Sequence, residues 1–378
     1  MTKAILRSLN SLCARDISTI NPQKDRDREF GYVDISAVDN VSKSIVSPQR
    51  TNGKLASVRA RQIIRQLDVI VSTTRPNLNA VAIVPGELDG EICSTGFCVL
   101  RCGPELDPAY LFAFVQSEGF VRALSNLVQG ALYPAVTDKQ VFAQNIPWVP
   151  LKDQHRIANH LKAQLTEIEK VRCALALQQL ETNTLADAII SQSINIAGTK
   201  HYSLGEVLEE VKNGVGDDWA SFSVWGATRD GLAPAKEPPG KKPERYKPAF
   251  PGTVFYNPMR ILIGSIAFVD DDDKPGITSP DYVVLTGKKD IVDSRWFYFW
   301  LRSPLGKQCI TSLARGAVRE RMLFNRLAEG YIELPDFKLQ QAASKALAEL
   351  KHLRKAIEIK MNEINLLPTK ILSQAFEM

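Results

Sequence analysis

The sequence lacks the features of a membrane protein and of several common enzyme classes. No apolar run in the 378 residues reaches the length of a membrane-spanning helix, and the N-terminus has no signal-peptide pattern, so the cytoplasm is the expected compartment. There is no Gly-rich phosphate loop, no HExxH zinc motif and no GxSxG nucleophile motif. These absences favour recognition or assembly over catalysis.

Metal-binding patterns are also scarce. The chain has only four histidines, and none of its six cysteines forms a CxxC pair. Cys93, Cys98 and Cys102 have a spacing that could suit a metal, but they fall in an alternating strand pattern. Reduced core thiols are the better interpretation, so no metal site is predicted.

Charge is spread thinly along the chain. The formal net charge is only +5, and no whole domain is strongly basic. Two windows are locally basic, residues 50–75 and residues 236–247. Basic loops are what contact with DNA phosphates requires, although a solvated charged surface is the alternative for both windows.

One long segment organises the sequence. Residues 151–197 contain neither proline nor glycine, and apolar residues recur at gaps of three and four, which places them on one helical face. A helix of this length, roughly 70 Å, is too long for an ordinary core and predicts a coiled-coil arm. The apolar stripe consists of Ile157, Leu161, Leu165, Ile168, Val171 and Leu175.

The segment has an echo near the C-terminus, and the repeat extends upstream of both helices. Gln154 matches Gln340 at a spacing of 186 residues, and the sequence around Tyr110 matches that around Trp296 at the same spacing. Further upstream, residues 94–100 match residues 279–285, and Arg75 matches Arg260, at a spacing of 185. The chain is therefore two copies of one unit, each a globular domain followed by a long helix.

This repeat predicts an α+β fold with two globular α/β domains in tandem and a pseudo-twofold arrangement. The two long helices are expected to pair as an antiparallel coiled coil. The expected boundaries are 1–150 for the first domain, 151–197 for its helix, 198–336 for the second domain and 337–378 for the second helix. The residues expected to pair the helices are Ile157, Leu161, Ile168, Leu347, Ile357 and Ile364.

Within the domains, local patterns predict individual elements. Residues 6–20 and 203–212 are expected to be opening helices, and residues 108–128 and 294–302 to be helical. Alternating segments predict strands near residues 32–35, 67–71, 81–84, 97–101, 253–256, 262–269 and 282–286. The run Asp270–Asp273 lacks the glycine and distal glutamate of a calcium loop and is expected to be a solvated hairpin tip.

Two segments resemble catalytic motifs but lack parts that the chemistry requires. Pro335-Asp336 followed by Glu358 and Lys360 mimics a nuclease PD…ExK motif, but the second part falls on the long helix, where charged residues are ordinary surface. Asn257-Pro258 begins an amino-methyltransferase motif but lacks its second proline and its aromatic residue. No catalytic residue is predicted.

The assembled segments resemble one family, the specificity (S) subunits of type I restriction-modification systems. The resemblance rests on residues 66–76 (QLDVIVSTTRP), 94–101 (STGFCVLR), 108–117 (PAYLFAFVQS) and Gly130 onward through IPWVPLKDQHRIANHL. It covers essentially the whole chain, including the two-copy layout. The departures lie in the second copy, where the helix entry reads PDFKLQ and the helix is about one turn shorter.

The resemblance implies a non-catalytic DNA-recognition subunit. Each domain would read one half of a bipartite double-stranded DNA target, and the helices would act as a ruler between the halves. Two methyltransferase (M) subunits and the restriction (R) subunits would dock on the chain. S-adenosylmethionine, ATP and magnesium would be bound by those partners and none by this chain. A coiled-coil scaffold without DNA readout is the alternative.

Candidate DNA-contacting residues are those on loops, because base edges must be reached by protruding side chains. Arg75 and Arg260 are the leading pair, since they hold equivalent positions after a strand. In the first domain the candidates are Lys54, Arg59, Arg61, Arg75, Tyr133 and Lys139. In the second domain they are Lys241, Lys242, Arg245, Arg260, Arg315, Arg319 and Arg321.

Overall fold

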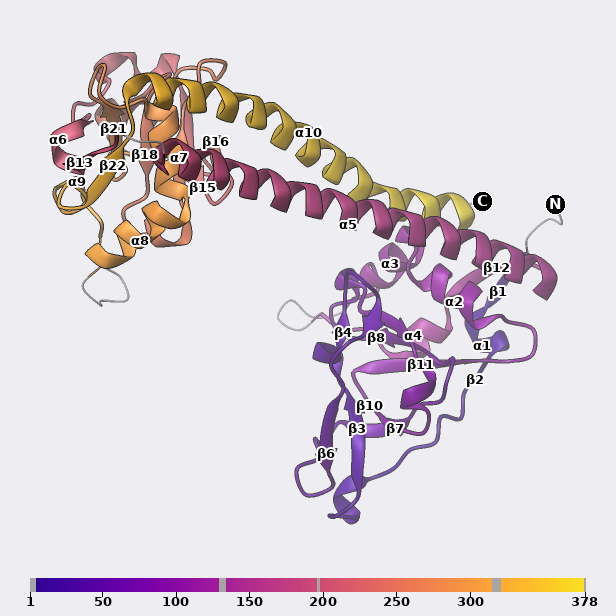
Figure 1. The fold of residues 1–378 in the computed structure, drawn as a ribbon. Coiled ribbons are helices and arrows are strands. Elements are labelled where there is room, and N and C mark those ends of the chain that lie inside the picture. Colours follow the sequence, from indigo (N-terminus) through magenta and orange to yellow (C-terminus); the bar gives the residue numbers. More distant parts are fainter. Residues whose placement is uncertain (1–4, 129–133, 196–197, 315–320, 377–378) are drawn as a thin grey trace. The chain divides into compact units, whose positions relative to one another are not determined.

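The computed structural model describes residues 5–128, 134–195, 198–314 and 321–376 (Figure 1). The chain divides into two compact units. The first unit combines the residues up to Ala174 with those from Met361 onward, and the second unit is Leu175–Lys360. Both units contain β-sheets and helices, which confirms the predicted α+β class.

The first unit is built on two four-stranded sheets. Their strands are Cys13–Ala14 (β2), Glu29–Val33 (β3), Gln49–Asn52 (β6), Ala60–Ile63 (β7), Val69–Ser72 (β8), Val81–Ile83 (β9), Ile92–Ser94 (β10) and Phe97–Cys102 (β11). The spatial orders are β6-β3-β10-β7 and β2-β11-β8-β9, and β3 and β10 run parallel. Two further pairs are Ile5–Ser8 (β1) with Asn145–Trp148 (β12) and Val38–Asp39 (β4) with Ser44–Ile45 (β5).

The second unit repeats this topology. Its strands are Lys200–Ser203 (β13), Leu208–Glu210 (β14), Ser223–Thr228 (β15), Gly231–Pro234 (β16), Lys247–Ala249 (β17), Val254–Tyr256 (β18), Ile266–Phe268 (β19), Gly276–Thr278 (β20), Val283–Gly287 (β21) and Tyr331–Leu334 (β22). The sheets have the orders β16-β15-β20-β17 and β14-β21-β18-β19, β15 and β20 run parallel, and β13 pairs with β22. The matching orders show that the sequence repeat is a structural repeat.

Short helices and turns connect the strands. The α-helices are Leu9–Leu12 (α1), Pro108–Val115 (α2), Glu118–Ser125 (α3), Asp138–Phe142 (α4), Leu204–Val207 (α6), Ser294–Arg302 (α7), Pro304–Leu313 (α8) and Phe324–Leu327 (α9). The 3-10 turns are Pro22–Lys24 (η1), Ile35–Ala37 (η2), Pro76–Leu78 (η3), Gly86–Leu88 (η4), Gly216–Ser221 (η5), Pro243–Arg245 (η6) and Ile261–Ile263 (η7).

The repeat extends to helix capping. Asp107 accepts a hydrogen bond from the Tyr110 amide at the start of α2, and Asp293 accepts one from the Trp296 amide at the start of α7. A side-chain oxygen at this position satisfies an amide that has no partner within the helix. The cap therefore explains why both helices begin where they do.

Two predictions about helices were wrong. The expected opening helices shrink to single turns, α1 and α6, because the residues around them pair as strands with distant segments: β1 with β12, and β13 with β22. The helix expected over residues 108–128 is broken between α2 and α3. Ser117 has an extended backbone there and its hydroxyl accepts the Phe120 amide, so it caps a new helix.

The two long helices are Leu151–Asn195 (α5) and Phe337–Phe376 (α10). Buried residues in α5 recur every seven positions, at Gln154, Leu161, Ile168, Leu175 and Thr182. A strict seven-residue repeat is typical of a coiled-coil seam, which is narrower than the stripe predicted from the sequence. Val171, which the predicted stripe included, is exposed for this reason.

Each unit contains the start of one long helix and the end of the other. In the first unit, Ala158 and Leu161 of α5 share an apolar cluster with Leu372 and Phe376 of α10. In the second unit, Ile190 of α5 shares a cluster with Ala343, Leu347 and Leu350 of α10. The helices therefore run antiparallel within each unit (Figure 1).

The remaining predicted pairing residues lie at or near this seam. Ile168 and Ile357 are buried, whereas Ile157 and Ile364 are half-buried.

No helix in the described part of the chain is long and apolar enough to cross a membrane. All six cysteines are free, and Cys13, Cys93 and Cys98 are buried. Burial raises the pKa of the Cys93 and Cys98 thiols, which keeps them in the neutral form.

Candidate nucleic-acid interface

In the first unit, hydrogen bonds between backbone groups bring four chain segments side by side. The Thr95 amide donates to the Arg59 carbonyl at 2.9 Å. The Thr73 amide donates to the Gly96 carbonyl at 2.9 Å. The Arg75 amide donates to the Pro134 carbonyl at 2.8 Å. We call this surface, made of residues 57–60, 94–97, 72–76 and 134–137, the first loop row.

Arg75 occupies an unusual backbone conformation in this row. Its φ and ψ angles are 49° and 60°, in the left-handed region that an L-residue other than Gly, Asn or Asp seldom adopts. The side chain is exposed. Strain of this kind persists only where surrounding structure imposes it, and it gathers at functional sites.

The second unit assembles an equivalent surface. Strand pairing places Tyr256 opposite Val283, so the residues that follow Tyr256 lie beside those that precede Val283. The Met322 amide donates to the Pro258 carbonyl at 3.1 Å. Since β17 pairs with β20, the residues around Arg245 also approach this edge. We call residues 245–247, 257–260, 278–282 and 321–322 the second loop row.

Most of the candidate DNA-contacting residues can be placed. Arg59 and Arg75 lie in the first loop row, Lys139 is exposed on α4 directly after it, and Arg245, Arg260 and Arg321 lie in the second loop row. Lys241 and Lys242 are exposed just before η6. Tyr133, Arg315 and Arg319 lie outside the described residues.

Other candidates are placed apart from the row or are already engaged. The Lys54 amide donates to the Arg26 carbonyl, so Lys54 lies with the loop around Arg26. Arg61 is half-buried and its Nε donates to the Val58 carbonyl at 2.9 Å. Arg321 pairs with Asp281 at 3.4 Å, but both side chains are exposed, and such a pair is worth little and can yield to a phosphate.

Some cations of the two basic windows have partners within the fold. Arg50 pairs with Glu91 at 3.3 Å, but its side chain is 78% exposed, so this pair contributes little to stability. Lys247 is half-buried and its Nζ donates to the Tyr282 carbonyl at 2.8 Å, while burial lowers the pKa of its amine. The sequence could not separate Lys247 from exposed cations, because only the folded chain brings its partner near.

The sequence repeat pointed to Gln154 and Gln340 without revealing their role. Both side chains are buried. The Gln154 Oε1 accepts the Asp107 amide at 2.8 Å, and its Nε2 donates to the Glu105 carbonyl at 2.9 Å and the Val149 carbonyl at 2.7 Å. The amide therefore joins the start of α5 to the segment that leads into α2.

Gln340 makes the same three bonds in the second unit. Its Oε1 accepts the Asp293 amide at 2.9 Å, and its Nε2 donates to the Ile291 and Pro335 carbonyls, each at 2.9 Å. A buried amide with every partner present fixes geometry, because any displacement would leave buried polar groups unpaired. Both units thus hold their long helix through the same contact.

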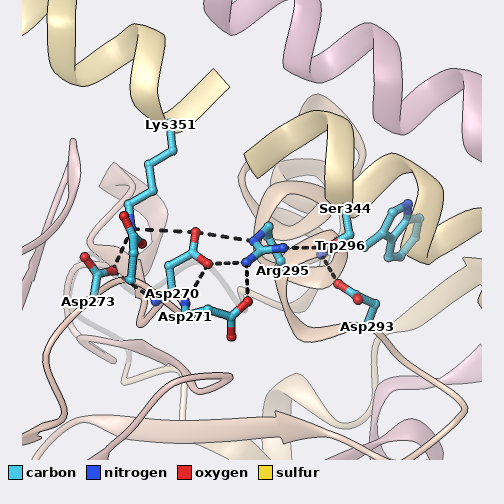
Figure 2. A network of polar contacts seen from close by, with 9 residues as sticks. Asp270, Asp271, Asp273, Asp293, Arg295, Trp296, Ser344 and Lys351 are labelled. Carbon is cyan, nitrogen blue, oxygen red and sulfur yellow. Dashed lines mark hydrogen bonds and ion pairs between the residues drawn. The ribbon is translucent and has the colours of Figure 1, made fainter. Parts of the chain in front are cut away.

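A charged network adds a second attachment in the second unit. The guanidinium of Arg295, on α7, bonds to Asp270, to Asp271 at 2.9 Å and to the Ser344 hydroxyl of α10 at 3.4 Å (Figure 2). Burial opposes the charge on Arg295, but the hydrogen bonds and charges of Asp270 and Asp271 together outweigh it and raise the pKa of the guanidinium. Asp270 is 5% exposed. The prediction of a wholly solvated tip was therefore wrong for this residue.

Lys351 of α10 also contacts the carboxylates of this network. Its Nζ bonds to Asp272 and lies 3.0 Å from Asp273 and 3.7 Å from Asp270 (Figure 2). The hydrogen bond from Lys351 lowers the pKa of the Asp272 carboxyl. We call Asp270–Asp273 with Arg295 and Lys351 the acidic-turn clamp; it ties the β19–β20 connection to α10.

The nuclease-like pattern does not form a site. Asp336 immediately precedes α10, whereas Glu358 and Lys360 lie within that helix. At about 1.5 Å per residue the helix separates Asp336 from Glu358 by roughly 33 Å, so the side chains cannot meet at one metal ion. Across the described residues, no group of three His, Cys, Asp or Glu side chains could hold a metal ion.

Comparison with known proteins found likeness in solved structures. No protein-family model and no curated protein matches the sequence. A chain from a structure of the complex assembly and conformational transition of a type I restriction-modification system matches with a TM-score of 0.74 and 27% identity, over 100% of this chain and 98% of that chain.

Two further structures match along the whole chain. The HsdS subunit from Thermoanaerobacter tengcongensis has a TM-score of 0.56 and 26% identity, over 99% of this chain and 97% of that chain. The S subunit of a type I restriction-modification system from M. genitalium has a TM-score of 0.54 and 14% identity, over 100% of this chain and 98% of that chain, which shows the fold alone.

The fold and its internal repeat define a class of α+β protein with two sheet-rich units and two long helices that pair within each unit. Its particular likeness, over the full length, is to the specificity subunits of type I restriction-modification systems, and the resemblance indicated by the sequence is confirmed. That class of subunit is non-catalytic.

Proposed function

We propose that the chain is the DNA-recognition subunit of a type I restriction-modification complex, in which each unit reads one half of a bipartite target. The observation that carries this proposal is the repeated loop row, which presents Arg75 in the first unit and Arg260 in the second at the same place in the same topology. Exposed arginines on loops suit base-edge and phosphate contacts in the major groove.

The two long helices set the distance between the half-sites. The buried Gln154 and Gln340 support this role, because each locks the start of a long helix to its own unit. A loop row held firmly to a stiff helix keeps a defined position along it, which is what a fixed spacer requires.

Methyltransferase subunits, two for one chain, and restriction subunits dock on this chain. Adenine methylation and cleavage then occur in those partners, which bind S-adenosylmethionine, ATP and magnesium. The solved type I restriction-modification assembly that this chain resembles supports a role within a complex.

Arg260→Ala tests the DNA contact. We expect specific DNA affinity of the assembled methyltransferase to fall about 10- to 100-fold at moderate salt, because a good arginine contact to a base contributes that much. Lys289→Ala, which removes another exposed cation of the second unit, is the matched control and should change affinity little. Binding by Arg260→Ala equal to that of the control would remove Arg260 from the interface.

The rival function is a protein scaffold without DNA readout. Co-expression with the partner methyltransferase subunit, followed by mapping of methylated adenines across the host genome, separates the two. We expect one bipartite motif with a fixed gap. A stable complex that leaves the genome unmethylated and has no DNA affinity would favour the scaffold.

A further inference from the structure

An open cavity of about 380 Å³ lies between η7 and α8 in the second unit. Its wall is apolar, formed chiefly by Ile261, Ile266, Leu301 and Ile310. Leu262 and Ile263 form its lip and are 56% and 52% exposed. Exposed large apolar side chains beside an open apolar cavity are typical of a site where another molecule binds.

The equivalent position in the first unit, between η3 and α3, has no open cavity. Pro76, Asn79, Val81 and Leu124 line it, at the positions equivalent to Ile261, Gly264, Ile266 and Ile310, and no room for a water molecule remains. This equivalence follows the repeat spacing of 185 to 186 residues.

The two places differ at one aromatic lining residue. Phe120 lines the closed place in the first unit, and its amide donates to the Ser117 hydroxyl at the start of α3. Gly306 holds that position in α8, where its amide donates to the Ser303 hydroxyl. Gly306 does not line the cavity, and a β-carbon there would lie 2.3 Å from the Trp300 carbonyl oxygen and 2.5 Å from the Leu301 Cα, so the second unit cannot carry an aromatic side chain of its own at this position.

The cavity is also positively charged. Arg229, Arg302 and Lys307 line it, and no carboxylate is among its lining residues. The Arg302 guanidinium donates only to carbonyls in its described contacts, those of Gly264, Ile266 and Arg229, so its charge is not cancelled by an anion there. In the first unit Val121 stands where Lys307 stands here, so the charge is particular to the second unit.

We propose that this cavity, which we call the η7–α8 pocket, docks a segment of a partner subunit that inserts one phenylalanine- or leucine-sized side chain flanked by carboxylates. The first unit supplies the argument for the anchor, since its own Phe120 lines the equivalent place. The three cations supply the argument for acidic flanks. DNA presents acidic groups but no protruding apolar side chain.

The proposal rests on the proposed function, because the partner is a subunit of the assembled complex. The proposed pocket also makes the two units unequal as binding sites for a partner. The segment binds the second unit and not the first, so a partner carrying it attaches at one end of the pseudo-symmetric chain.

The test uses the purified full chain without its partner subunits, so that the pocket is free, and a fluorescein-labelled heptapeptide of sequence Asp-Glu-Asp-Phe-Asp-Glu-Asp. Fluorescence anisotropy should show saturable binding that weakens at high salt. The same peptide with alanine in place of phenylalanine should bind about 10-fold more weakly or worse, because the buried aromatic area is lost. Equal binding of the two peptides would overturn the proposal.

Two matched variants locate the binding. Ile263→Asp places a carboxylate on the lip and should abolish binding of the phenylalanine peptide, while the exposed position leaves the unfolding midpoint unchanged. Leu78→Asp makes the same change at the equivalent position of the first unit, which is 49% exposed, and should leave peptide binding intact. Unchanged binding by Ile263→Asp, or equal loss by both variants, would refute the assignment.

Measuring DNA binding by the same variants distinguishes failure of the pocket proposal from failure of the proposed function. Peptide binding by the free chain that depends on Ile263, together with no DNA specificity in the assembled complex, would uphold the pocket and refute the proposed function. Loss of DNA affinity in Ile263→Asp with peptide binding retained would show that DNA, not a protein segment, occupies this place.

Discussion

Arg75 combines an exposed guanidinium with a left-handed backbone conformation. The guanidinium suits DNA contact, whereas the backbone conformation lowers the stability of the fold by about 1–2 kcal/mol, a penalty that glycine would not have. Arg260, its sequence equivalent, has a negative φ of −129° and no such strain. The repeat therefore preserves the residue but not its backbone.

Arg75→Gly should separate these effects. We expect the free energy of unfolding to rise by about 1 kcal/mol, because glycine adopts this conformation without strain. We also expect DNA affinity to fall, because the guanidinium is lost. Arg75→Ala, the control, should lose affinity without the gain in stability. Urea unfolding and DNA titration of the assembled methyltransferase measure both, and a glycine variant less stable than the alanine variant would contradict this account.

Gln154→Leu probes the buried amide at the start of α5. The substitution keeps the size of the side chain but leaves the Asp107 amide and two carbonyls without a partner. We expect a loss of roughly 2–5 kcal/mol in unfolding free energy, since each buried polar group left unpaired costs about 1–3 kcal/mol. Gln179→Leu makes the same change at an exposed position of α5, and chemical denaturation should place it within about 0.5 kcal/mol of the parent.

At the scale of elements, the acidic-turn clamp ties one hairpin connection to α10 through charge. Its carboxylates are stabilising only when ionised, and its amine only when protonated. The hydrogen bond from Lys351 lowers the pKa of Asp272 below 3.8. Burial opposes the charge on Lys351, but bonds to Asp272 and Asp273 raise the pKa of its amine above 10.5.

Lys351→Met should therefore destabilise the chain in a defined pH window. We expect a loss of about 1–3 kcal/mol near neutral pH. A carboxyl whose pKa is lowered contributes above its unfolded value and stops contributing as pH falls through the folded value, so the difference from the parent should shrink below about pH 3.8. Lys355→Met, at an exposed site on α10, is the control. An effect independent of pH would point to lost packing rather than lost charge.

Periodicity and repeat spacing were enough to predict the long helices and the strands β3, β8, β9, β11, β18 and β21, but neither the remaining strands nor the short opening turns; the strand expected over residues 262–269 is reduced to β19. Leu6, Leu9 and Leu12 have a spacing that suits a helix, yet the pairing of β1 with β12 joins residues about 140 positions apart and overrides it. Local sequence carries no information about such a partner. The same limit applies to Asp270, whose cation partners lie on two other helices.

The position of the two loop rows, where we propose DNA contact, was predictable only in part. Position after a strand indicated Arg75 and Arg260, because the repeat marks equivalent loops. The alignment of four segments into each loop row depends on backbone hydrogen bonds between distant residues. Composition likewise could not tell the exposed Arg59 from Lys247, whose amine is bonded within the fold.

At the scale of the whole molecule, the proposed ruler role requires α5 to be continuous. An insertion of four residues after Gln178 adds about 6 Å, close to two base pairs, and rotates the following residues by only about 40°. We expect the spacer of the methylated motif to lengthen accordingly. The same insertion in the loop at residues 236–240 should leave the spacer unchanged. A spacer that is insensitive to the helix insertion would refute the ruler.

The end of the chain completes the core of its beginning. Phe376 lies 5.2 Å from the ring of Tyr110 and 5.5 Å from that of Phe114, inside the first unit's apolar cluster. During synthesis, this core therefore stays incomplete until Leu372 and Phe376 have left the ribosome. A chain shortened before Leu372 should therefore leave Tyr110 and Phe114 partly uncovered, so the first unit depends for its core on the far end of α10.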